Sequence, residues 1–119
     1  MRVMVLVKAT ADSERGFEPT PDASEAMAAM GRFNDELRAA GILVMAEGLL
    51  PSAEGKRVAF DGADRTVIPG PFMPAEELVA GFWLWDVASM DEAVAWVKRC
   101  PNPMPGPSTI EIRPLHRLA

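Results

Sequence analysis

The sequence predicts a single-domain α+β fold, and three observations lead to this prediction. The chain has 119 residues, which is long enough to bury one hydrophobic core, and no second domain or repeat divides it. Several segments are apolar at consecutive or alternating positions, as strands are. Two further segments carry apolar residues at helical spacing. We therefore treat residues 1–119 as one domain.

The first half of the chain begins with a strand and a helix. A strand is expected over 2–8, because both alternating sets of residues are apolar. Residues 9–21 are polar and follow neither period, so a mobile surface loop is expected there. The helix should follow from an N-cap at Asp22 or Ser24, with Gly41 as its stop. Its predicted buried stripe consists of Met27, Met30, Phe33, Leu37 and Ala40.

The middle of the chain reads as a strand followed by a hairpin. The strand is expected over 42–50, where both faces are apolar except for Glu47. Segments 57–60 and 65–68 flank an Asp-Gly turn signal at Asp61. We expect this hairpin to extend an edge of the sheet.

The second half repeats the order strand, helix, strand. Residues 78–87 form the strongest strand pattern in the chain. Ser89 and Glu92 fit a capping box, in which a hydroxyl and a carboxylate satisfy free amides at a helix start. Pro101 ends this second helix, and residues 109–114 alternate as a last strand.

This order is that of a ferredoxin-like β-α-β-β-α-β core with an inserted hairpin. Two helices cover only one face of such a sheet, so the apolar second face needs another cover. A second copy of the chain is the simplest source, which predicts a homodimer formed sheet to sheet. Trp83 and Trp85 are expected to anchor either the core or that interface.

Composition argues against several classes of partner. Lys and Arg number 12 against 17 Asp and Glu, and the net charge of −5 repels nucleic acid. No stretch approaches the roughly 20 apolar residues of a membrane span, and 2–8 is too short for a secretory signal. The single Cys100 suits a reducing cytoplasm. No metal-ligand spacing or nucleotide motif occurs, so no cofactor is expected.

Strand parity predicts one candidate site for a small ligand. Lys8 and Glu47 each stand near the end of an otherwise apolar strand face, and Glu111 shares a face of the last strand with Arg113. If these faces meet, they form a cavity with apolar walls and a few charged groups. Glu47 would then act as a general base, and Arg113 would hold an anionic group of the ligand.

Structural interpretations of the same residues stay open. Glu111 and Arg113 can form a solvated ion pair, and Glu47 can pair with a cation instead of abstracting a proton. The proline turn over 69–72 is expected to deliver Phe72 into the core. Glu77 either accepts hydrogen bonds from this turn or contacts a ligand. His116 has no partnered acid in any motif and is expected at the surface.

Four pieces of the sequence resemble the YCII-related family, and in particular its DGPF-domain branch, over the range from the first strand to Pro114. They are Gly41–Val44 with Glu47–Leu49 and Pro51, Pro69–Phe72 with Glu77 and Gly81, Glu92–Ala93 with Trp96, and Ile110–Pro114. Two positions depart from the branch. Pro69 stands where the branch has its Asp, and it offers neither a carboxylate nor an amide hydrogen. Glu76 stands where a basic residue is usual.

The resemblance implies a dimeric α+β barrel, a fold that elsewhere hosts small-molecule lyases and isomerases. It implies two alternative functions: an enzyme of that type working by general acid/base chemistry, or a non-catalytic accessory protein linked to an extracytoplasmic-function sigma factor. The enzyme requires Glu47 and Arg113 to converge on one cavity. The accessory protein requires an exposed apolar or acidic patch. The His-Asp pair of the YCII branch proper is not carried over, because His116 lies outside the matching pieces.

Overall fold

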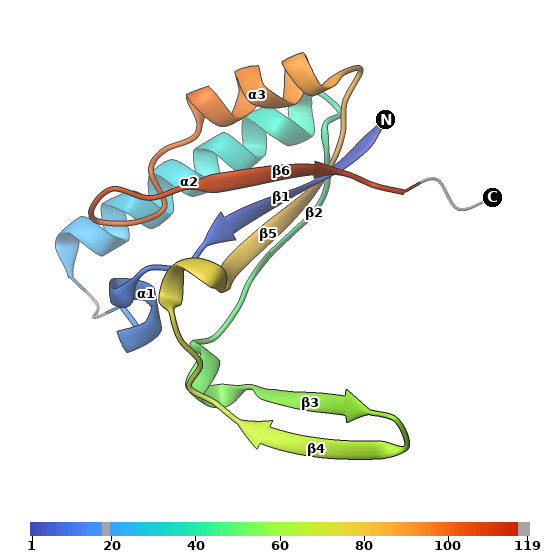
Figure 1. Cartoon of the computed structure of the whole chain (residues 1–119). Helices are drawn as coiled ribbons and strands as arrows, with labels where there is room; N and C mark the ends of the chain where they lie inside the picture. The colour runs from blue at the N-terminus through green and yellow to red at the C-terminus, as the bar shows by residue number, and fades with distance from the viewer. Residues whose placement is uncertain (18–19, 117–119) are drawn as a thin grey trace.

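The computed structural model describes residues 1–17 and 20–116, and Figure 1 shows how its strands and helices are arranged. The elements are β1 (Arg2–Lys8), α1 (Ala11–Arg15), α2 (Pro21–Ala39), β2 (Leu43–Gly48), the 3-10 turn η1 (Ser52–Glu54), β3 (Lys56–Asp61), β4 (Asp64–Pro69), the 3-10 turn η2 (Ala75–Glu77), β5 (Val79–Asp86), α3 (Met90–Arg99) and β6 (Ile110–Pro114).

Four strands form one antiparallel sheet in the order β2-β5-β1-β6. The two longer helices, α2 and α3, lie on the same side of this sheet (Figure 1). We call the side that they cover the helix face and the opposite side the open face. The combination of helices with antiparallel sheets agrees with the predicted α+β class.

The hydrophobic core lies between the helix face and the two long helices. Val3 and Val5 of β1 alternate into it, and Trp83 and Trp85 do the same from β5. Phe33 of α2 packs edge-on against both indoles, with ring centroids 6.2 and 6.3 Å apart. Burial of each such large side chain contributes roughly 1.5–3 kcal/mol. The two tryptophans are therefore core residues, which was one of the two roles predicted for them.

The ends of α2 confirm one prediction and correct another. Its N-cap is Thr20, whose hydroxyl accepts a hydrogen bond from the backbone, and Pro21 occupies the first turn, where its missing N–H costs nothing. The predicted N-caps, Asp22 and Ser24, were wrong, because they lie two and four residues after Thr20. Gly41 follows the helix with φ 74°, as the predicted stop.

Two details near α2 differ from the sequence prediction. Met27 and Ala40 were placed in the buried stripe but are exposed. The first turns of α2, with Met27, extend past the end of the sheet (Figure 1), and Ala40 follows the last residue of the helix. Residues 9–21 were expected to form a loop without structure. They contain α1, which a reciprocal capping box between Thr10 and Ser13 begins. Residues 18 and 19 of that expected loop lie outside the described part.

The hairpin does not extend the sheet, contrary to the prediction. β3 and β4 form a separate two-stranded sheet that projects away from the body of the molecule (Figure 1). The chain leaves from between β2 and β5, which pair with each other. The 3-10 turn η1, after Pro51, separates the hairpin from β2, and the 3-10 turn η2, after Pro74, separates it from β5. Gly62 makes the predicted tight turn at the tip, with φ 58°.

Gly70 at the base of the hairpin offers a test of this arrangement. A Cβ at Gly70 would lie 1.8 Å from the carbonyl oxygen of Ser52, so Gly70→Ala should destabilise the protein by about 2 kcal/mol or more. A Cβ at Gly31, within α2, meets nothing within 4 Å. Gly31→Ala should therefore stabilise the protein by about 0.5–1 kcal/mol. Urea unfolding measures both, and equal stability of the two variants would contradict the close approach.

Candidate functional site

An open cleft of about 280 Å³ lies where β2 ends and β5 begins, beside α2. Apolar side chains make up most of its wall, together with glycines of the two strands. Its lining residues are Val7, Phe17, Met30, Asn34, Ala46, Glu47, Gly48, Ala80, Gly81, Phe82, Trp83, Pro103 and Met104. Concave apolar sites with few polar groups are the usual form of a small-ligand site.

Trp83 and Asn34 fix one wall of the cleft. Parity along β5 directs Trp83 to the helix face, where its side chain is buried. Its indole Nε1–H donates a hydrogen bond of 2.8 Å to Oδ1 of Asn34 on α2. This bond satisfies the buried indole and ties the wall of the sheet to the helix. The sequence reasoning missed Asn34, although it stands next to Phe33 of the predicted stripe.

Glu47 reaches the same cleft from the edge strand β2. It is the only ionisable residue among the described lining residues, and its side chain is exposed. The prediction assumed that buried neighbours would enclose it, but Met45 and Leu49 are themselves 46% and 51% exposed. Within residues 1–17 and 20–116, Glu47 forms no ion pair. Glu47 therefore sits at the mouth of the cleft and not in its interior.

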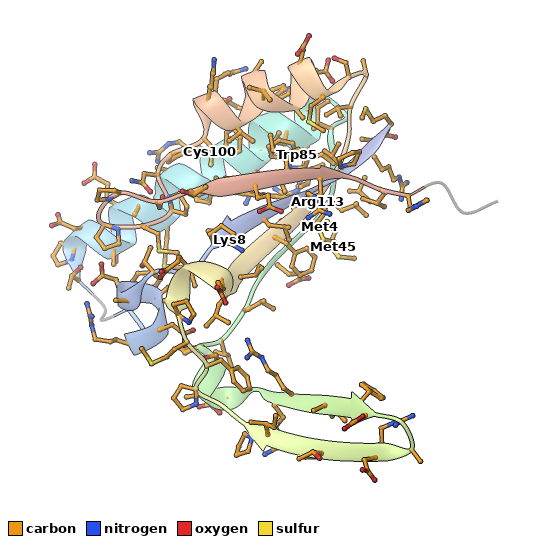
Figure 2. The ribbon with its side chains drawn as sticks, viewed as in Figure 1. Met4, Lys8, Met45, Trp85, Cys100 and Arg113 are labelled. Carbon is orange, nitrogen blue, oxygen red and sulfur yellow. The ribbon has the colours of Figure 1, made fainter. Side chains whose placement is uncertain are left out.

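Lys8, Glu111 and Arg113, three of the other predicted site residues, lie on the open face. Two rows of paired residues cross the sheet there, and the first of them starts at Glu47, at the border with the cleft. One row runs Glu47, Phe82, Leu6, Glu111 across the sheet, and the next runs Met45, Leu84, Met4, Arg113. Figure 2 shows Met4, Met45, Lys8 and Arg113 on the side away from the helices, with Trp85 and Cys100 on the helix side. The open face thus has an apolar centre and charged ends.

The open face does not bring Glu47 and Arg113 together. Arg113 pairs with its neighbour Glu111, with the guanidinium Nη1 3.1 Å from the carboxylate. β6 and β2 are opposite edges of the sheet, three strand spacings or roughly 14 Å apart. Lys8 lies at the end of β1, on the same face. The pairing that the sequence analysis left open for Glu111 and Arg113 is the arrangement found.

The proline turn that precedes β5 is held by a carboxylate that the sequence analysis did not single out. Glu14 of α1 accepts hydrogen bonds from the backbone N–H of Ser52, at 3.0 Å, and from the Ser52 hydroxyl. The same hydroxyl accepts from the backbone N–H of Phe72, at 2.9 Å. Glu77, which was predicted for this task, has an exposed side chain. The capping box of α1 was the signal that places Glu14 on a defined helix.

Phe72 is likewise not a core residue. It is half-buried and lies outside the core cluster, where the guanidinium of Arg57 stands 4.0 Å from its ring centroid. A cation over an aromatic ring is favourable by roughly 0.5–1 kcal/mol at such a partly exposed site. The turn therefore closes the base of the hairpin and does not deliver an anchor into the core.

Residues 1–118, almost the whole chain, match the YCII-related domain. The chain belongs to the YCII-related domain family. It is also 33% identical, over 76 residues, to an uncharacterized protein of Rhizobium meliloti (strain 1021). That alignment covers 64% of this chain and 61% of the length of the relative.

The described residues contain no group of three or more metal-ligating side chains. His116 is exposed, near the end of the described chain. Of the helices described, none is long and apolar enough to cross a bilayer.

Cys100 is a protected thiol. It follows α3, is half-buried, and donates a hydrogen bond of 3.2 Å to the carbonyl of Pro101. Burial raises the pKa of the thiol from 9.0 to about 11. The reactive thiolate is therefore scarce near neutral pH.

We predict that Cys100 reacts with Ellman's reagent at pH 8 at least about tenfold more slowly in the folded protein than in urea. Because the folded pKa is higher than the unfolded one, the group's contribution to stability is present below pH 9 and is lost as the pH rises to about 11. Cys100→Ser should remove this part of the pH dependence. Equal reactivity of the folded and unfolded thiol would contradict its protection.

We further predict that Glu14→Ala lowers the free energy of unfolding by about 1.5–3 kcal/mol, because it leaves two donors of Ser52 without a charged acceptor. The matched variant Glu77→Ala removes an exposed carboxylate near the same turn and should cost less than about 0.5 kcal/mol. Thermal and urea unfolding of both variants measure the difference. A larger loss of unfolding free energy for Glu77→Ala than for Glu14→Ala would show that Glu77 is the carboxylate that holds the turn.

Proposed function

We propose that this protein binds a small, mostly apolar molecule in the cleft beside Trp83. The observation that supports this most is the make-up of the wall: among the described lining residues, Asn34 and Glu47 are the only ones with polar side chains apart from the hydrogen-bonded indole. The apolar part would give affinity and the two polar groups would orient the ligand. A volume near 280 Å³ favours a ligand smaller than a typical drug.

The charge at the mouth of the cleft indicates which ligands to prefer. The carboxylate of Glu47 attracts a cationic or hydrogen-bond-donating group and repels another carboxylate. Arg113, which was predicted to hold an anionic group of the ligand, and Lys8 line no part of the described cleft. The proposed ligand is therefore an apolar molecule with an amine or hydroxyl group at one end.

An acid/base enzyme that uses Glu47 alone, without the Arg113 that the sequence prediction required, is the second candidate function. One observation favours it: Glu47, the only ionisable lining residue described, borders the apolar wall at Phe82, to which it is paired across the strands. A general base needs such a carboxylate within reach of a bound substrate. In this case Glu47→Gln should abolish turnover and leave binding within a few fold, because the amide keeps the shape but cannot accept the proton.

The assembly that we propose is a homodimer formed through the open face. Its apolar centre, Met4, Leu6, Met45, Phe82 and Leu84, and its charged ends have the distribution of an interface core and rim. The strand order β2-β5-β1-β6 supports a ferredoxin-like core and, with two copies, a dimeric α+β barrel. The Pro69–Phe72 turn supports membership of the DGPF branch. The lone, protected Cys100 supports a cytoplasmic location.

Binding can be tested with matched pairs of small ligands. We expect short n-alkylamines to quench tryptophan fluorescence and raise the melting temperature, because Trp83 lines the cleft and a ligand of the native state stabilises it. Carboxylates with the same alkyl chains should bind at least about tenfold more weakly. Glu47→Gln should abolish this preference.

The control is Glu111→Gln, which removes a carboxylate from the same sheet but not from the cleft. It should leave the preference for amines unchanged. If neither ligand series binds at millimolar concentration, or if Glu111→Gln has the effect expected of Glu47→Gln, the cleft is not the site.

A further inference from the structure

The β3–β4 hairpin carries an apolar face that no other element of the described residues covers. Cross-strand pairing places Val58 opposite Val67 and Phe60 opposite Arg65 on one side of the hairpin. All residues of both strands are exposed, with Phe60 71% and Val67 59% accessible. We call this side the arm face; its residues are Lys56, Val58, Phe60, Arg65, Val67 and Pro69.

Exposed apolar side chains are concentrated in and around this hairpin. Of the fourteen exposed large apolar residues in the described chain, seven lie within residues 49–73. They are Leu49, Leu50, Val58, Phe60, Val67, Ile68 and Met73. Scattered exposed apolar residues are normal, but Val58, Phe60 and Val67 of this set adjoin on the arm face, and a contiguous group marks an interaction surface.

A hairpin of this kind needs a packing partner. An isolated two-stranded hairpin is only marginally stable in water. β3 and β4 have extensive contacts with each other and few contacts with the other elements. The radius of gyration is 16.1 Å, against about 13.5 Å for a compact chain of this length. The projecting hairpin accounts for this extended shape (Figure 1).

The charges of the hairpin favour a second copy of the chain as that partner. The arm face carries Lys56 and Arg65 and no carboxylate, because Asp61 and Asp64 pair on the opposite side. Segment 56–69 contains three basic and two acidic residues, so the rest of the chain has nine basic against fifteen acidic residues. A cationic apolar arm is complementary to an acidic body, and each copy supplies both.

The position of the hairpin fits the same partner. It projects on the side of the sheet opposite to the helices, so it extends beyond the open face, where Met4 and Met45 lie (Figures 1 and 2). In a two-fold symmetric dimer, a surface contacts either the same surface of the other copy or a second surface, and the symmetry axis then repeats that second contact. One partner can therefore cover the open face and the arm face together.

From these observations we infer that the β3–β4 hairpin is an arm that packs its arm face against a second copy of this chain. The inference rests on the proposed homodimer and adds to it a second contact, outside the four-stranded sheet. Val58, Phe60 and Val67 supply the apolar contact. Lys56 and Arg65 face carboxylates of the partner.

The test compares two lysine substitutions that add the same charge to the same strand. Val67→Lys places it on the arm face, and Thr66→Lys places it on the opposite side. Sedimentation across a dilution series should give the wild type a mass of twice 12.9 kDa. Val67→Lys should raise the dimer dissociation constant at least about tenfold, the effect of one important interface contact, and Thr66→Lys less than about threefold.

A third variant separates this inference from the proposed homodimer. Leu84→Lys places the charge at the centre of the open face. If Leu84→Lys dissociates the dimer and Val67→Lys does not, the arm inference is wrong and the sheet-to-sheet dimer stands. A wild type that is monomeric at about 100 µM overturns both and leaves the arm face to a different protein.

Hydrogen exchange on the wild type gives a readout that requires no substitution. Amides of residues 56–61 and 64–68 should be protected at concentrations where the protein is dimeric and should exchange at least about tenfold faster after dilution to monomer. Amides of β1 should change less, because they are bonded within the four-stranded sheet. Equal protection of the hairpin at both concentrations overturns the inference. Because this experiment uses the wild type, it decides the matter even if Val67→Lys does not fold.

Discussion

α2 and α3 pack on the same side of a four-stranded sheet, and this asymmetry of coverage governs the rest of the molecule. On β5, Trp83 and Trp85 are buried because they point towards the helices. Phe82 and Leu84 alternate with them along the same strand but point to the open face, where they are only half-buried. One strand therefore supplies both the core of the monomer and the apolar centre of a surface. The cleft forms where helix coverage ends, at the end of β2 and the start of β5.

Much of the fold could be predicted from the sequence because its elements have strong local periods. The unbroken apolar runs predict the bounds of β1 and β5, and the capping residue Ser89 predicts the start of α3, to within one residue. The placement of the hairpin could not be predicted in this way. Its Asp-Gly turn reveals that two strands pair, but nothing in a local pattern tells whether that pair joins a larger sheet.

The candidate site was harder to predict because it depends on contacts between distant segments. Asn34 and Trp83 are 49 residues apart, and Glu14 and Ser52 are 38 apart. The role proposed for Glu47 depended on strand parity, which the register shift between Leu43 and Met45 interrupts. Leu43 packs against the core as a result, while Met45 lies on the open face. Parity correctly grouped Glu111 with Arg113, since β6 is regular.

The two outer strands of the sheet also limit how these molecules can join. β2 has an irregular register near Val44 and carries Glu47 at an exposed position, and β6 ends in Arg113 and Pro114, a residue without an amide hydrogen. Bulges, charges and prolines on outer strands obstruct the addition of a further strand, the step by which sheets grow into fibrils. The apolar face of the sheet can then be covered by a contact that closes with a fixed number of copies. Growth by adding strands at the edges of the sheet is disfavoured.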